Sequence, residues 1–243
     1  MALTDDELEA LLEGLEADLT GEVLDALNGV ADEFARAVDG ATRLVAAAFL
    51  VSRVGEMWKR RVPGIMARLR RIAGRGAQAA AEDVGESAPS AADLDTALQP
   101  YMDATTQLLN AVGDRLAAEA TQSLAEGVNA GETLDQLKAR MTAVFADDGA
   151  QLGPTRAERI AMTEATRAFN AGELAAAQAL TGPDRPLVKQ WLTRRDKRVR
   201  EAHADVNGQL QFLDDPFTVG GIPKQYPGDP TAPPDRKIKC RCR

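Results

Sequence analysis

Apolar side chains recur every three or four positions through most of the chain, which is the spacing of amphipathic helices. Residues 4–19 are rich in leucine at this spacing. Thr4 and Glu7 have the separation of a capping box, so a helix is predicted to begin there. A second helical pattern covers residues 23–38, and Gly40 is expected to end it. The beginning of the chain is therefore predicted to form two helices.

The same spacing continues beyond Gly40 and predicts further helices. Pro63 fits the first turn of one of them, whereas Pro100 is expected to kink another near its start. The small polar stretch 85–90 (GESAPS) is predicted to be a linker or a sharp turn, and 147–154 a second turn. The predicted helices are 42–61, the segment that starts at Pro63, 92–128, 131–145 and 155–180.

The pattern changes in the last part of the chain. The segments 187–193 (LVKQWLT) and 209–213 (QLQFL) are predicted to be strands, with a short helix ending at Gly208 between them. Residues 214–237 are rich in proline and are predicted to form a long, ordered and irregular loop. The final segment 237–243 (KIKCRCR) is expected to be an edge strand.

Composition supports a helical protein. Apolar residues make up 44% of the chain and aromatic residues only 4%, which favours helices packed through small side chains over a β-sandwich. We expect a mainly α fold, with an elongated N-terminal helical region plus a small α+β C-terminal domain with a few short strands. The expected divisions are an N-terminal helical region at 1–88, a long connecting helix at 89–130 and a C-terminal domain at 131–243.

Charge is distributed unevenly along a chain whose net charge is −8. Residues 53–76 hold 8 basic residues and 1 acidic residue, and residues 154–243 are also net basic. Such blocks suit contacts with charged partners, although solvated helix faces explain them more simply. The chain start lacks the basic stretch of a signal peptide, and no apolar run is long enough to span a bilayer. We therefore expect a protein made in a cytoplasm, without membrane contact.

Four groups of residues occur in order towards the end of the chain. They are Thr163-Glu164, Arg167-Ala168 and Asn170-Ala171-Gly172; Lys189, Trp191, Asp196, Arg198, Val199-Arg200, His203 and Gly208; Pro216-Phe217, Gly220-Gly221 and Tyr226-Pro227-Gly228-Asp229-Pro230; and Cys240-Arg241-Cys242. Together these groups resemble the Mu F-like minor head protein family of tailed phages. Lys239 stands where that family usually has asparagine. The N-terminal half shows no resemblance beyond a generic helical head region.

The resemblance implies a non-enzymatic, structural minor capsid protein that acts in head morphogenesis. Such a protein is expected in the virion, inside the capsid near the portal vertex. Its expected partners are the portal protein and the major capsid or scaffolding protein, and contact with packaged DNA or ejection with it is also implied. The alternatives are a non-phage DNA-binding or scaffolding protein, and the delivery module of an effector or toxin. The sequence ends one residue after Cys242, so we do not expect an effector there, and this counts against the delivery module.

His203, Cys240 and Cys242 are residue types that bind zinc, which takes four ligands or three plus water. The fourth ligand would be Asp196, Asp205 or water. In the alternative, the histidine is hydrogen-bonded and the thiols pack as small hydrophobes, so no cofactor is the default expectation. The two cysteines are expected to be free thiols in a reducing compartment. A Cys–His nucleophile pair is available, but no nucleophile elbow or oxyanion loop accompanies it.

The other motif residues are expected to be structural. Glu164 and Arg167 are predicted to pair on one helical face and to anchor that helix to 196–203, while Trp191 is expected in the core. Basic residues elsewhere are expected to contact the portal protein or DNA phosphates without reading sequence. The motif residues are Thr163, Glu164, Arg167, Asn170, Trp191, Asp196, Arg200, His203 and Gly208. The basic residues are Arg194, Arg195, Lys197, Arg198, Arg68 and Arg71.

Overall fold

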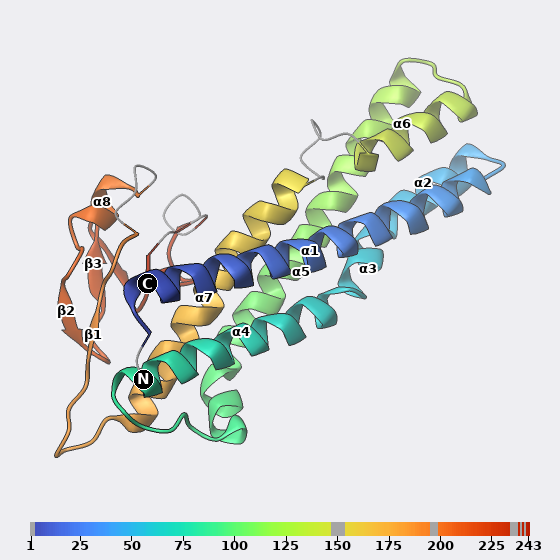
Figure 1. Ribbon diagram of the computed structural model, residues 1–243. Helices are drawn as coiled ribbons and strands as arrows, with labels where there is room; N and C mark the ends of the chain where they lie inside the picture. Colours follow the sequence, from blue (N-terminus) through green and yellow to red (C-terminus); the bar gives the residue numbers. More distant parts are fainter. Residues whose placement is uncertain (1–2, 147–153, 195–198, 234–237, 239, 241) are drawn as a thin grey trace. The chain divides into compact units, whose positions relative to one another are not determined.

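The computed structural model describes residues 3–146, 154–194, 199–233, 238, 240 and 242–243. The chain is mainly helical, with short antiparallel strands near its C-terminal end (Figure 1), which confirms the predicted fold class. In chain order the elements are α1 (Asp5–Asp39), α2 (Leu44–Ser52), α3 (Val54–Lys59), α4 (Val62–Asp83), α5 (Ala91–Asn129), α6 (Leu134–Ala146), α7 (Pro154–Leu180), β1 (Val188–Gln190), α8 (Glu201–Ala204), β2 (Leu210–Phe212), β3 (Phe217–Val219) and β4 (Ile222–Lys224).

The first helix, α1, is continuous where the sequence predicted two helices. Gly21 lies within it and costs helix propensity without ending the helix. The predicted capping box is confirmed, because the Thr4 N–H donates to Glu7 Oε2 at 2.8 Å and the Glu7 N–H donates to Thr4 Oγ1 at 3.3 Å. The predicted helix 42–61 is instead two helices, α2 and α3, which meet at Arg53.

The later helices begin and end close to the predicted positions. Pro63 lies in the first turn of α4, and residues 86–90 form a loop after that helix. Pro100 lies inside α5, which continues through it. The predicted turn at 147–154 falls, up to residue 153, outside the described residues.

The chain forms two compact units, each built from separate stretches of sequence. The first unit contains Met1–Leu19, Ala67–Thr105 and Ala161–Arg243, and all the described strands belong to it. The second unit contains Thr20–Met66 and Thr106–Ile160. Because α1, α4, α5 and α7 each contribute to both units, the units are linked by continuous helices.

The second unit packs around Trp58, whose side chain is fully buried. Its indole N–H donates to the carbonyl oxygen of Leu109 at 2.7 Å, which satisfies the polar atom of this large apolar ring. A Cβ at Gly113 would lie 2.8 Å from the Trp58 ring and 3.0 Å from the carbonyl oxygen of Gly55. Glycine is therefore required where α3 and α5 approach each other.

In the first unit, α4 and α7 cross with their backbones in contact. A Cβ at Gly76 would overlap the carbonyl group of Phe169, and a Cβ at Gly172 would overlap that of Ala73. No other residue type fits these two positions without moving a helix. The close crossing fixes α7, which carries the polar residues described below.

The strands form two separate antiparallel pairs, and β1–β3 lie beside α8 in Figure 1. The two predicted strands pair as β1 and β2, with Val188 opposite Phe212. The predicted edge strand 237–243 is wrong for its described residues, where only a single bridge joins Thr193 to Cys242.

The second pair, β3 and β4, corrects the prediction of an irregular loop at 214–237. Val219 and Ile222 are cross-strand partners around a two-residue turn. The turn residues Gly220 and Gly221 have φ angles of 57° and 79°, which residues with a Cβ rarely adopt. The hairpin places Phe217 and Lys224 at its open end, where both side chains are buried.

Candidate functional site

A buried ion pair lies on the face of α7 that contacts the C-terminal segment. Arg167 Nη1 is 2.8 Å from Glu164 Oε2, and the two side chains are 1% and 9% exposed, so the predicted pairing is confirmed. Arg167 Nε donates to the carbonyl oxygen of Gly228 at 2.8 Å. Gly228 has a φ of 87°, and a Cβ on it would lie 3.3 Å from the Arg167 backbone. Glycine thus lets this loop lie directly against the helix.

The same helix binds backbone carbonyl groups near the end of the chain. Asn170 Nδ2 donates to the carbonyl oxygens of Pro227, at 3.0 Å, and Cys242, at 3.2 Å. The Thr166 hydroxyl donates to the carbonyl oxygen of Cys240 at 3.4 Å. Two segments far from α7 in sequence are therefore held by their backbones.

The predicted anchoring of α7 to 196–203 stays a prediction, because part of that segment is not described. The described contacts of Arg167 and Asn170 with other segments go to the 227–228 turn and to Cys242. Residues 195–198 lie outside the described residues. Thr163 is buried on α7 as part of the same motif.

The turn after β4 is organised by Asp229, a motif residue to which the sequence assigned no role. Its carboxylate accepts hydrogen bonds from the N–H groups of Gln225 and Thr231, each at 2.8 Å, and from the Thr231 hydroxyl at 2.6 Å. The side chain is buried, so these donors replace water around the carboxylate. The Asp-Pro-Thr sequence, with its tendency to form Asx turns, is the signal that would have identified this role.

His203, Cys240 and Cys242 converge in the core of the first unit. The imidazole Nδ1 lies 3.4 Å from the Cys242 sulfur and 3.6 Å from the Cys240 sulfur. Their exposed fractions are 1%, 2% and 4%. On the other side of the ring, Lys224 Nζ lies 3.3 Å from Nε2. Asp205, a predicted fourth ligand, is exposed and does not join this group, and Asp196 lies outside the described residues.

The electrostatics of this cluster favour one thiolate. A hydrogen bond from Cys242 holds the pKa of the Cys240 thiol well below its usual range. The pKa of Cys242 is raised by its interaction with Cys240 and by burial, and the Trp191 indole acts in the opposite direction. Burial lowers the pKa of Lys224. The two thiols therefore differ in acidity, with Cys240 the more acidic, and burial favours the neutral form of the neighbouring lysine.

Trp191 encloses the cluster and is fully buried, which confirms its predicted place in the core. Its ring packs edge to face on His203 at 5.5 Å between centroids, and on Phe217 at 5.3 Å. Gly208, with a φ of 83°, ends the α8 connection and donates its N–H to the Trp191 carbonyl oxygen at 2.7 Å. Arg200 donates to the carbonyl oxygen of Ile238 at 2.6 Å and so holds the segment before Cys240.

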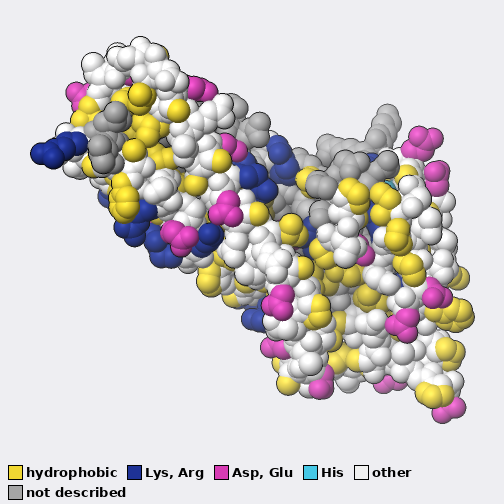
Figure 2. All heavy atoms as spheres, turned by 180° about the vertical axis from the view of Figure 1, so that it is seen from behind, with side chains coloured by type: hydrophobic (Ala, Val, Ile, Leu, Met, Phe, Trp, Pro, Cys, Tyr) yellow, Lys and Arg dark blue, Asp and Glu magenta, His cyan; other side chains and the backbone are white. Residues whose placement is uncertain are grey.

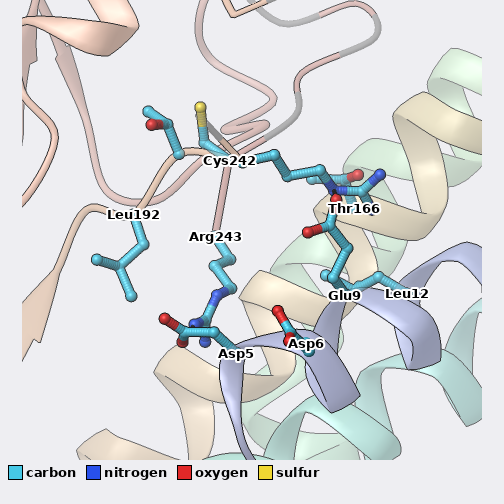
Figure 3. A pocket seen from close by; sticks show the side chains of 10 residues that line it. Asp5, Asp6, Glu9, Leu12, Thr166, Leu192, Cys242 and Arg243 are labelled. Atoms are coloured by element: carbon cyan, nitrogen blue, oxygen red, sulfur yellow. Dashed lines mark hydrogen bonds and ion pairs between the residues drawn. The ribbon is translucent and has the colours of Figure 1, made fainter. Parts of the chain in front are cut away.

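Arg194, predicted as a contact for the portal or DNA, faces carboxylates of α1. Its guanidinium lies 3.3 Å from Glu16 and 3.8 Å from both Glu9 and Glu13, and its side chain is 9% exposed. A DNA phosphate would have to displace these carboxylates. A cavity of about 240 Å³ lies beside them. Figure 3 shows Arg243 reaching towards Asp5 at this cavity, with the Cys242 sulfur pointing away from the acidic side chains.

The other predicted contact residues differ in their surroundings. Arg68 pairs with Asp18 at 3.1 Å, whereas Arg71 is exposed on α4. On the face seen in Figure 2, acidic side chains lie among the basic ones. The remaining candidates, Arg195, Lys197 and Arg198, lie outside the described residues.

The fold and site define a mainly α protein whose small α+β C-terminal part is tied to a polar helix face. The model of the family described as Phage Mu protein F like protein matches residues 116–243, more than half of the chain. The chain belongs to this family of phage head morphogenesis proteins, which are structural components associated with the virion. No curated protein and no solved structure matches the chain. Among the described residues, no helix is both long and apolar enough to cross a membrane.

Proposed function

We propose that this protein is a minor capsid component that binds the portal protein at the portal vertex, without catalytic activity. The main support for binding to the portal protein is an exposed apolar face of the β1–β2 pair. Val188, Leu210 and Phe212 are 50%, 59% and 65% exposed. Val188 is the cross-strand partner of Phe212, and Leu210 is two residues from Phe212, so all three side chains point to the same side.

Large apolar side chains that remain exposed together mark surfaces for protein contacts. This face lies within the part of the chain that matches the family of head proteins. The other large apolar side chains exposed among the described residues, Phe49 and Val128, belong to the second unit. An apolar interface of this kind favours a protein partner over DNA, whose recognition depends on phosphate charge.

The test is a pull-down with the portal protein of the same phage at ~0.15 M and ~0.5 M salt, the second of which screens surface charge within a few Å. Wild-type protein should be retained at both concentrations. The double variant Leu210→Ser/Phe212→Ser should bind at least ~10-fold more weakly, because two apolar anchors are lost. Phe49→Ser is the matched control and should bind like wild type.

Each other outcome overturns a defined part of the proposal. If wild type and the double variant bind equally well, the β1–β2 face is not the interface. Binding to the scaffolding or major capsid protein alone would replace the portal as partner. DNA retained at ~0.15 M salt and released at ~0.5 M, without portal binding, would favour a DNA-binding protein.

A further inference from the structure

The three ligand-type side chains at His203, Cys240 and Cys242 come from separate parts of the chain. His203 lies in the short helix α8, and the two cysteines lie in the C-terminal segment. Their nitrogen and sulfur atoms all lie within 4.8 Å of one another, and all three residues are buried. The proposed function in the phage head does not require two thiols beside one imidazole nitrogen.

The separations match those around a tetrahedral zinc ion. Zinc binds thiolate sulfur at ~2.3 Å and imidazole nitrogen at ~2.05 Å, which places nitrogen and sulfur ~3.5 Å apart at the tetrahedral angle. The observed distances from His203 Nδ1 are 3.4 Å to the Cys242 sulfur and 3.6 Å to the Cys240 sulfur. Both nitrogen–sulfur separations therefore fit a zinc ion bound between these side chains.

The surroundings of the cluster provide two independent features of a ligand site. Nδ1 faces the two sulfurs, and the Trp191 ring packed edge to face on the imidazole holds this orientation of the ring. The buried indole N–H of Trp191 makes no hydrogen bond among the described residues, and Cys242 belongs to the same buried cluster. A thiolate at Cys242, as in a metal complex, is the strong acceptor that this donor lacks.

We propose that His203 Nδ1, Cys240 Sγ and Cys242 Sγ bind one zinc ion, with water as the fourth ligand. Among the described residues, no other histidine, cysteine, aspartate or glutamate joins the group. Binding takes the neutral imidazole with its proton on Nε2, removes the two thiol protons to solvent, and forms two Zn–S bonds and one Zn–N bond without any redox change. The ion would join α8 to the C-terminal segment and so stabilise the first unit.

The experiment uses the full chain, purified without chelator, with zinc measured by elemental analysis and by titration of the metal-free protein. A single zinc per chain and a Kd below ~1 μM are expected. Cobalt substituted at the site should give the intense visible absorption of tetrahedral thiolate coordination. Cys240→Ser and Cys242→Ser should each weaken binding at least ~100-fold, because each removes a ligand. Asp205→Asn, which changes an exposed carboxylate near the site, is the control and should bind like wild type.

Circular dichroism and tryptophan fluorescence establish that each serine variant is folded. If a variant is not folded, cobalt titration of the wild-type protein tests the site. Zinc binding that is absent from the folded, fully reduced protein would overturn the proposal. So would serine variants that bind as tightly as wild type, because the ion would then lie elsewhere. A Cys240–Cys242 disulfide in protein purified from a reducing cytoplasm, without bound zinc, would assign the pair to redox chemistry instead.

Discussion

Replacing Arg167 with methionine is expected to destabilise the first unit by about 3–5 kcal/mol. The variant removes the guanidinium that lies 2.8 Å from the buried Glu164 carboxylate, and the Gly228 carbonyl oxygen loses its donor. Methionine keeps most of the apolar volume of the arginine stem, so a large cavity does not explain the loss. Most of the cost should come from the loss of the guanidinium beside that carboxylate, because the carboxylate is only 9% exposed.

The double variant Glu164→Gln/Arg167→Met separates the charge from the packing. It should regain at least about 2 kcal/mol relative to Arg167→Met, because the buried carboxylate is gone. Urea unfolding followed by Trp191 fluorescence measures both, in a Trp58→Phe background that removes the reporter in the second unit. Two conditions would refute the reasoning: a loss below about 1 kcal/mol in Arg167→Met, or a double variant that is no more stable than the single one.

Three further predictions concern helix contacts and protonation. Gly172→Ala should cost more than about 2 kcal/mol, because its Cβ overlaps the Ala73 carbonyl, whereas Gly74→Ala, with open space around its Cβ, should stabilise by up to about 1 kcal/mol in thermal unfolding. Burial raises the pKa of Glu173 from 4.5 to about 7, so the folded state holds this proton more tightly and stability falls as the pH rises through that range. In urea titrations at about pH 4 and about pH 8, Glu173→Gln should match wild type at the lower pH and exceed it by about 3 kcal/mol at the higher. Thr4→Ala should cost about 1 kcal/mol, with faster amide exchange in the first turn of α1.

Local patterns were sufficient to predict most of the helices and one important contact. The pairing of Glu164 with Arg167 follows from their spacing of three residues, which places both on one face of any helix. The capping box at Thr4 is local in the same way. The β3–β4 hairpin was missed because the prolines around it indicated a loop. The signal was present in Val219-Gly220-Gly221-Ile222, since two adjacent glycines between β-branched residues are typical of a tight hairpin turn.

Contacts between distant segments of the chain have no comparable signal in the sequence. Arg194 and Glu16 are 178 positions apart, and neither charge pattern nor periodicity indicates that they meet. The sequence therefore assigned Arg194 to an external partner, although its guanidinium faces three carboxylates of α1. The cluster of His203 with the two cysteines could be proposed from residue type alone. Its Lys224 neighbour could not, because the hairpin that carries this lysine was not predicted.

The C-terminal segment is held largely through its backbone, and this bears on what its side chains can do. Asn170 and Thr166 bind the carbonyl oxygens of Cys242 and Cys240, and Arg243 exchanges both backbone hydrogen bonds with Leu192, at 2.7 and 2.8 Å. Backbone anchoring leaves both thiols free to face the histidine ring. Anchorage and ligand chemistry are therefore separable. A cysteine-to-serine change should remove the proposed metal while the segment stays attached, whereas a change at Asn170 should loosen the segment and weaken metal binding only indirectly.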